Sequence, residues 1–106
     1  VLRAVAALLD ENRRAEDFLA RYGGEEFVMI LPETDLGQAA LVAEKLRRCV
    51  ENARLNYDGR VIPVTLTAGV AELLAEDTNA AQLMERADKA LYRGKQRGRN
   101  RVERAE

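Results

Sequence analysis

The chain has 106 residues, of which 47% are hydrophobic and 33% charged, and its formal net charge is −1. This length suits one small domain with a single core, and the composition is typical of a soluble globular protein. The nearly balanced charge argues against a nucleic acid polymer as partner, and the absence of histidine excludes His-based acid–base catalysis and His-ligated zinc. The single cysteine, Cys49, cannot form an internal disulfide, which indicates a reducing, cytoplasmic compartment.

The first half of the chain predicts a helix followed by a β-hairpin. Apolar residues recur at helical spacing from Val1 to Leu9, and the chain begins inside this pattern without a methionine, so we expect it to belong to a longer protein. The runs Phe18–Tyr22 and Phe27–Leu31 have strand composition, and the short glycine-containing link between them predicts a hairpin. Because the second run is apolar throughout, we expect a strand covered on both faces.

The second half of the chain predicts two more helices and a second hairpin. A helix is expected to start at Thr34 or Asp35, and Asp58-Gly59 indicates a tight turn. Alternation over Val64–Val70 predicts a half-buried strand, and a last helix is expected from Thr78 or Asn79 to Gly98, before a short strand at Val102. No apolar run approaches the length of a membrane span. We therefore expect an α/β (α+β sandwich) fold, a mainly antiparallel sheet flanked by helices in one domain.

The link of the first hairpin is Gly23-Gly24-Glu25-Glu26. Glycine allows positive φ and close approach of a bulky ligand. Two adjacent carboxylates at a turn are suitable ligands for Mg²⁺, which binds one or two protein carboxylates together with phosphate oxygens. An isolated sequence of this kind is more often a solvated turn, so the interpretation depends on the motifs around it.

An Arg-x-x-Asp motif, Arg14 to Asp17, lies a short distance before these glycines. Arginine pairs in a bidentate manner with phosphate or with the O6/N7 edge of guanine. Aspartate accepts hydrogen bonds from the N1–H and N2 amino groups of guanine. The alternative is a surface ion pair at a helix end, worth at most about 1 kcal/mol.

The segment Arg93–Arg101 is strongly basic. Its cations could simply complement the helix dipole. A functional interpretation is a triphosphate clamp, with Lys95 and Arg99 on one helical face because they are four residues apart. A nucleic-acid patch is disfavoured, because no aromatic stacking platform accompanies the cations.

Taken together, these motifs resemble the GGDEF family of diguanylate cyclases over essentially the whole chain. The resemblance implies a palm-like nucleotidyl-cyclase fold and the condensation of two GTP molecules into cyclic di-GMP by two facing domains, so that a homodimer is expected. The matching segments are Val1–Ala6, Arg21–Phe27, Val64–Val70, Ala87–Tyr92, Lys95 and Gly98–Asn100.

The resemblance also implies residue roles. Glu25 would ligate Mg²⁺ (or Mn²⁺) and take part in catalysis with Glu26. Gly23-Gly24 would let the triphosphate lie against the turn, while Lys95 and Arg99 would hold its terminal phosphates.

A second site is implied as well. Arg14 and Asp17 match the family's product-inhibition site for cyclic di-GMP, and Lys45 stands where a secondary arginine often completes it. The family's domain begins with a strand and helices, bearing a metal-binding aspartate and guanine-reading residues, that this chain does not contain. We therefore expect residues 1–106 to form a single partial GGDEF domain that lacks the first strand, leaves two strand edges unpaired and does not complete the GTP site alone.

Two other functions remain open from the sequence. The chain could be a module that binds cyclic di-GMP through Arg14 and Asp17 without making it. It could also be a catalytically inert interaction domain that dimerises through exposed sheet edges. In each case we expect the cytoplasmic part of a larger bacterial signalling protein.

Overall fold

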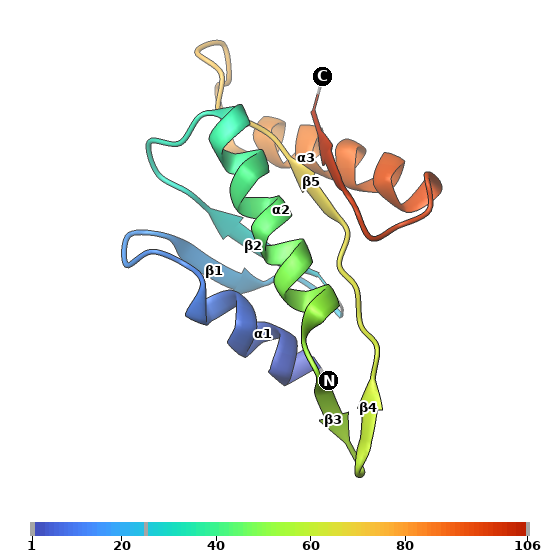
Figure 1. Cartoon of the computed structure of the whole chain (residues 1–106). Helices are drawn as coiled ribbons and strands as arrows, with labels where there is room; N and C mark the ends of the chain where they lie inside the picture. The colour runs from blue at the N-terminus through green and yellow to red at the C-terminus, as the bar shows by residue number, and fades with distance from the viewer. Residues whose placement is uncertain (1, 25, 106) are drawn as a thin grey trace.

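The computed structural model describes residues 2–24 and 26–105, and over these residues it contains three helices and six short strands (Figure 1). Two strands follow the first helix, three follow the second and one follows the third. The elements are α1 (Leu2–Glu11), β1 (Phe18–Arg21), β2 (Phe27–Ile30), α2 (Leu36–Asn52), β3 (Leu55–Tyr57), β4 (Arg60–Ile62), β5 (Ala68–Val70), α3 (Ala80–Gln96) and β6 (Val102–Arg104). None of these helices has the length and apolar character that a membrane span requires.

The strands form three separate pairs. β1 and β2 make an antiparallel hairpin in which Phe18 faces Ile30, and β3 and β4 make a second one. The second hairpin turns at Asp58 and Gly59, whose φ values are 52° and 75°, as a tight two-residue turn requires. β5 pairs with β6 in parallel. Within residues 2–24 and 26–105, β2 is therefore bonded only to β1 and β5 only to β6, so each of these two strands has one edge without a partner strand.

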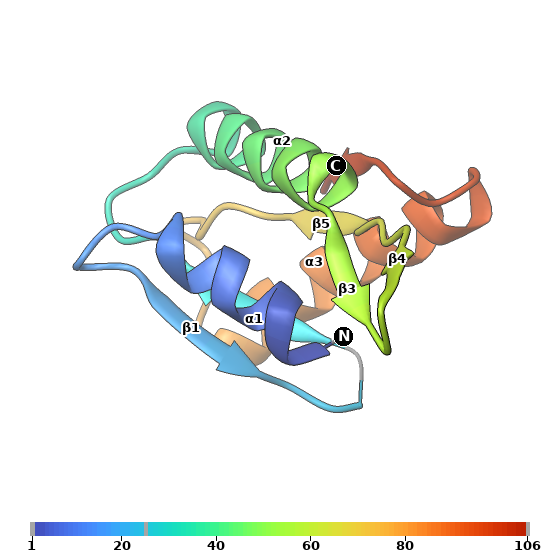
Figure 2. The same cartoon turned by 60° about the horizontal axis from the view of Figure 1, so that its bottom comes forward.

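The main core lies between α1, α2 and the first hairpin (Figure 2). Val5 and Leu9 of α1 meet Leu46 and Val50 of α2, and half-buried residues of β1, β2 and β3 pack against them. The side chain of Asp35 caps α2 by accepting a hydrogen bond from the Gln38 amide at 2.8 Å. The predicted start of this helix at Thr34 or Asp35 is thus confirmed, with Asp35 as the cap.

The pair β5–β6 lies between α2 and α3, which makes the sandwich (Figures 1 and 2). α3 packs directly on β5 because Gly69 has no side chain: an added Cβ would lie 2.2 Å from the Ala87 carbonyl oxygen and 2.4 Å from the Leu91 nitrogen. Ala90 of α3 is fully buried at this contact. Asn79 caps α3, as predicted, by accepting from the Gln82 amide at 3.1 Å.

Two strands differ from the prediction. β2 is half-buried rather than covered on both faces, and its Ile30 is 54% exposed. The predicted strand Val64–Val70 is reduced to Ala68–Val70, because β6 pairs with only these three residues. In both cases a strand needs neighbours to be covered and bonded, and the described part of the chain supplies only one neighbour for each.

Candidate functional site

The loop between β1 and β2 is closed at its base and open at its tip. The Tyr22 amide donates a hydrogen bond to the Glu26 carbonyl at 2.7 Å, and the Arg21 guanidinium donates to the Gly24 carbonyl, with Nη2 at 2.6 Å. Gly23 has a φ of 124°, a backbone conformation that glycine adopts far more readily than other residues. A Cβ atom added at Gly23 or Gly24 would meet no other atom within 4 Å. The two glycines thus leave space for a ligand beside the backbone. Glu25, the predicted metal ligand, lies outside the described residues.

Lys95, in the last turn of α3, reaches this loop from the far end of the sequence. Its Nζ lies 3.9 Å from Oε1 of Glu26, and both side chains are partly exposed. Packing of α3 on β5 carries the end of the helix to the hairpin. The fold thus brings together two of the residues that the sequence singled out, a cation and a carboxylate at one solvent-facing place.

Arg99 is not on the face of α3 that carries Lys95, and the prediction of a shared helical face is wrong. α3 ends at Gln96, and Gly98 follows with a φ of 116°. Glycine in this left-handed conformation terminates a helix, so Arg99 lies in the turn beyond it. The Arg99 amide donates to the Gly94 carbonyl at 3.0 Å, and this bond folds the turn back over the helix end.

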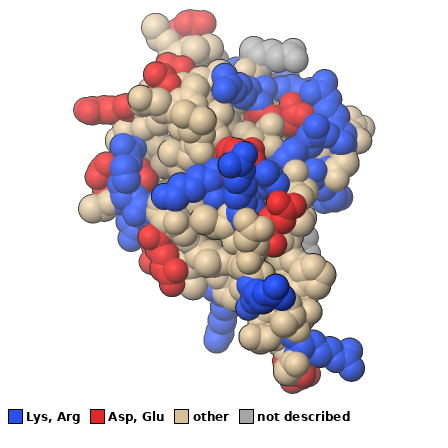
Figure 3. Space-filling model, viewed as in Figure 1, with Lys and Arg blue, Asp and Glu red and all other residues tan. Residues whose placement is uncertain are grey.

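The connection between α3 and β6 is rich in cations, with Arg97, Arg99 and Arg101. Figure 3 shows lysine and arginine side chains gathered over this part of the molecule, at the upper right. Some of this charge is neutralised locally, because Glu103 pairs with Arg97 at 3.1 Å and with Arg101 at 3.6 Å. Over residues 2–24 and 26–105, the guanidinium of Arg99 has no ion-pair partner.

Arg14 and Asp17 form a preorganised pair in the turn between α1 and β1. Arg14 Nη2 lies 3.1 Å from Asp17 Oδ1, and the Arg14 amide donates to Asp17 Oδ2 at 2.8 Å. The Asp17 side chain is only 3% exposed, whereas that of Arg14 is 52% exposed. Burial acts to raise the pKa of Asp17, but the hydrogen bonds from Arg14 outweigh it and hold this pKa below its ordinary value.

The guanidinium of Arg14 is fixed on a second side. Its Nη2 donates to the hydroxyl of Thr34 at 3.0 Å, which ties the turn to the connection between β2 and α2. The Arg14–Asp17 pair therefore lies at one end of the β1–β2 hairpin, and the loop between β1 and β2 that contains Gly23, Gly24 and Glu26, called the signature loop below, lies at the other end. The structure does not bring these two predicted sites into one.

A metal ion is not accommodated by the described residues alone. Within residues 2–24 and 26–105, no group of three or more His, Cys, Asp or Glu side chains gathers closely enough to hold one. The described carboxylate of the signature loop, Glu26, has a lysine as its neighbour. A hard cation takes several oxygen ligands, so the described donor set does not fit Mg²⁺.

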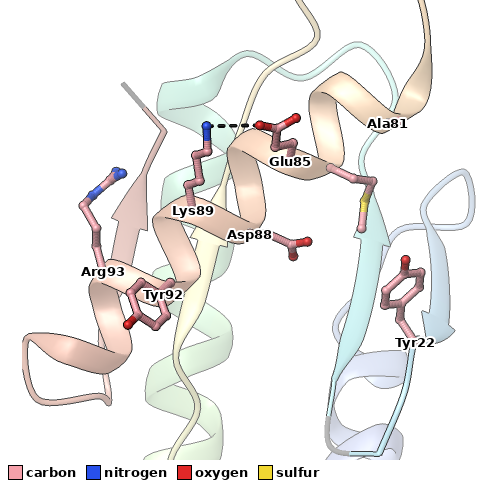
Figure 4. A pocket seen from close by; sticks show the side chains of 8 residues that line it. Tyr22, Ala81, Glu85, Asp88, Lys89, Tyr92 and Arg93 are labelled. Carbon is pink, nitrogen blue, oxygen red and sulfur yellow. Dashed lines mark ion pairs between the residues drawn. The ribbon is translucent and has the colours of Figure 1, made fainter.

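A hollow of about 680 Å³ lies between α3 and the end of β1 (Figure 4). Tyr22 bounds it on the hairpin side, and Asp88 points from α3 toward that side. Tyr92 of α3 also lines this hollow and is 62% exposed. Lys89 pairs with Glu85 at 3.1 Å along the helix. The sequence pattern did not indicate this hollow, because its two sides come from distant elements.

Comparison with known proteins identifies the relatives of this chain. The family model described as "Diguanylate cyclase, GGDEF domain" matches residues 1–101. The chain is 46% identical over 102 residues to Diguanylate cyclase A of Treponema denticola, covering 96% of this chain and 28% of that protein. It is 39% identical over 103 residues to Diguanylate cyclase DgcP of Pseudomonas aeruginosa, covering 97% of this chain and 15% of that protein. The chain thus spans well under a third of these curated relatives.

Solved structures resemble the fold closely. The GGDEF domain of DgcB from Caulobacter crescentus, solved in complex with c-di-GMP, matches with a TM-score of 0.90 and 36% identity, over 98% of this chain and 62% of that one. The active GGEEF domain of a diguanylate cyclase from Vibrio cholerae matches with a TM-score of 0.87 and 31% identity, over 99% and 66%. The motifs, the fold and these relatives agree, and the chain belongs to the GGDEF-domain family of diguanylate cyclases.

Proposed function

We propose that this chain carries the triphosphate-binding part of a diguanylate cyclase site, which condenses two GTP molecules into cyclic di-GMP. The observation that carries the proposal is the approach of Lys95 to Glu26, because it brings a cation from the end of α3 against the signature loop. Membership of the family supports the reaction, and the open backbone at Gly23-Gly24 supports a bulky anionic ligand beside the loop. Glu25 and Glu26 are the proposed catalytic carboxylates, and we propose Glu25 as the metal ligand.

The chemistry explains why cations are needed there. The ribose 3′-oxygen of one GTP forms a bond to the α-phosphorus of the other, the bond from that phosphorus to its bridging oxygen breaks, and pyrophosphate leaves. The hydroxyl proton passes to a base, and a second, reciprocal step closes the ring. Negative charge accumulates on the departing pyrophosphate, so Lys95 and Arg99 stabilise it best when they contact the β- and γ-phosphates.

We propose further that residues 1–106 are part of a GGDEF domain and act with a second copy. Each domain holds one GTP, and the two must face each other for the transfer. Support comes from the absence of a metal-binding cluster among the described residues and from the 62% and 66% coverage of the solved domains. The divalent ion that the family generally uses, Mg²⁺ or Mn²⁺, would then require donors beyond the described ones.

Nucleotide binding tests the proposal. The probe is a GTP analogue with a methylene group between the α- and β-phosphates, which cannot release pyrophosphate, and the measurement is calorimetry on the wild type and on Lys95→Ala. Because a hydrogen bond to a charged group is lost, we expect Lys95→Ala to weaken binding by about tenfold or more. Lys89→Ala removes the same charge from the same helix, where the side chain is 70% exposed, and is expected to bind as the wild type does. Equal affinities for all three chains would contradict the proposal.

Turnover tests the second part. Purified residues 1–106 incubated with GTP and Mg²⁺ are expected to release no cyclic di-GMP. Appreciable product, detected by chromatography, would show that these residues complete a site by themselves.

Cyclic di-GMP binding is a second candidate function, favoured by the geometry of Arg14. Its guanidinium is half exposed yet fixed by the buried Asp17 and by Thr34, so little side-chain entropy is lost when a guanine or phosphate binds. Calorimetry with cyclic di-GMP is expected to show binding that Arg14→Ala abolishes. Arg48→Ala, which removes a 70% exposed arginine of α2 away from this turn, is the control. No binding together with a tight dimer would favour the interaction-domain alternative.

A further inference from the structure

The turn after α3 has a backbone that its own residues do not favour. Arg99 and Asn100 have φ values of 64° and 48°. This left-handed region is sterically unfavourable for residues other than glycine, although asparagine tolerates it best. Two consecutive residues in this region persist only where neighbouring groups hold them. The backbone contacts of the turn are the Arg99 amide to the Gly94 carbonyl and the Asn100 amide to Thr67 Oγ1, each at 3.0 Å.

Side chains of α2 hold the turn from the other side. Arg47 Nη1 donates to Asn100 Oδ1 at 2.9 Å, and Asn100 Nδ2 donates to Oε2 of Glu51. The side-chain amide of Asn100 therefore has a hydrogen-bond partner at both its oxygen and its nitrogen. Asn100 is far from both residues in the sequence, and the contact exists because α2 packs against β5 and β6.

Arg47 is itself rigidly placed. Its side chain is only 15% exposed, its Nε donates to Glu44 Oε1 at 2.6 Å, and its Nη1 lies 3.4 Å from Glu51 Oε1. The carboxylates of Glu44 and Glu51 therefore orient the planar guanidinium of Arg47 toward Asn100. In contrast, the adjacent Arg48 has a side chain that is 70% exposed, and its Nε lies 3.6 Å from Glu44 Oε1.

We propose that Arg47 and Glu51 of α2 are positioning residues for Arg99. By binding both ends of the Asn100 side chain, they keep the left-handed turn in place and hold Arg99 where the proposed function requires a cation for the terminal phosphates. The role of Arg99 in phosphate binding rests on the proposed function. The fixing of the turn by Arg47 and Glu51 does not depend on that function. Arg47 acts through Asn100 and is assigned no contact with the nucleotide.

Amide hydrogen exchange tests the positioning without any ligand. In Arg47→Ala, the amides of Arg99 and Asn100 are expected to exchange about tenfold faster or more, since local opening of the turn becomes easier. The helical amide of Arg97, bonded to the Arg93 carbonyl at 2.9 Å, is expected to keep its rate. Arg48→Ala, the matched control, is expected to change neither. An unchanged rate at the turn, or an equal acceleration throughout the chain, would overturn the inference.

A double-mutant cycle tests the consequence for binding. Arg47→Ala is expected to weaken binding of the α,β-methylene GTP analogue about fivefold or more. Binding of GMP, which lacks the β- and γ-phosphates, is expected to stay unchanged. In an Arg99→Ala background, Arg47→Ala is expected to cause no further loss, because it acts only through Arg99. If Arg99→Ala weakens binding of the analogue but Arg47→Ala does not, this inference fails while the proposed function stands. If Arg99→Ala has no effect, the proposed role of Arg99 fails, and the exchange rates still decide whether Arg47 holds the turn.

Discussion

Arg86 of α3 binds the carboxylate of Asp77 through both of its terminal nitrogens, Nη1 to Oδ1 at 2.7 Å and Nη2 to Oδ2 at 2.8 Å. Asp77 also accepts from the Leu74 amide at 2.8 Å, and Arg86 donates to the Glu72 carbonyl at 2.8 Å. The connection between β5 and α3 is thus held against the helix that it precedes. Glu72 in turn accepts from the Leu36 amide at 2.9 Å, which links the same connection to the start of α2.

This pair predicts a specific loss of stability in acid. The hydrogen bonds from Arg86 lower the pKa of Asp77 from 3.8 to about 2. Because the folded pKa is the lower one, the contribution of Asp77 to stability is complete above about pH 4 and is lost as the pH falls toward 2. Urea unfolding at a series of pH values is expected to show this decline in the wild type and a smaller one in Asp77→Asn. Glu76→Gln, at the exposed neighbouring residue, is the control and is expected to show the same decline as the wild type. If the stability of Glu76→Gln depended on pH as little as that of Asp77→Asn, the decline could not be assigned to Asp77.

The pair of Arg14 and Asp17 predicts a pKa change on substitution. In Arg14→Ala the side-chain hydrogen bonds are lost while the burial of Asp17 remains, so the pKa of Asp17 is expected to rise. The wild type loses the contribution of this carboxylate as the pH falls through the lowered folded pKa, and the variant is expected to lose it at higher pH. The ¹³C chemical shift of the Asp17 carboxyl, followed against pH, measures the change. Glu16→Gln removes the exposed carboxylate next to Asp17 and is expected to leave its pKa much closer to that of the wild type.

The contact between Lys95 and Glu26 predicts an effect on anion binding rather than on stability. Both side chains are more than a third exposed and 3.9 Å apart, so Glu26→Gln is expected to change the free energy of unfolding by less than about 1 kcal/mol. Removing the negative charge leaves Lys95 free for an anion. Affinity for inorganic pyrophosphate without metal is expected to rise by about fivefold at most, since unit charges 4 Å apart in water interact by about 1 kcal/mol.

Salt dependence and a matched variant sharpen this prediction. The gain in Glu26→Gln is expected to shrink as ionic strength rises, because exposed charges are screened. Glu85→Gln frees Lys89 on the same helix and serves as the control. An equal gain in both variants would mean that net charge, rather than the place of Lys95, governs pyrophosphate binding.

Gly69 predicts the largest loss of stability from a small substitution. A Cβ there would lie 2.2 Å and 2.4 Å from backbone atoms of α3, which cannot rotate away as a side chain can. Gly69→Ala is therefore expected to push α3 from β5 and to lower the free energy of unfolding by about 3 kcal/mol or more. Gly24→Ala, where the added atom meets nothing within 4 Å, is the control in urea unfolding. A loss below about 1 kcal/mol in Gly69→Ala would show that the helix does not pack as closely as described.

Local sequence signals predicted most of the elements. The helix starts predicted at Thr34 or Asp35 and at Thr78 or Asn79, the turn at Asp58-Gly59 and the helix end near Gly98 all depend on a few neighbouring residues, and each is confirmed. The motif order also indicated the family, which the comparisons confirm. The roles of Glu25, Glu26, Lys95 and Arg99 in catalysis and binding stay predictions.

The amino-acid sequence by itself determined where helices and hairpins begin and end, because capping, turn formation and hydrophobic periodicity depend on neighbours in the chain. Only the tertiary structure decided that Lys95 meets Glu26 and that Arg47 reaches Asn100. These relationships join residues far apart in the sequence, and they arise from the packing of α2 and α3 on β5 and β6. The sequence specifies which charged and polar side chains are available, whereas the packing of the helices on the strands sets the distances between them.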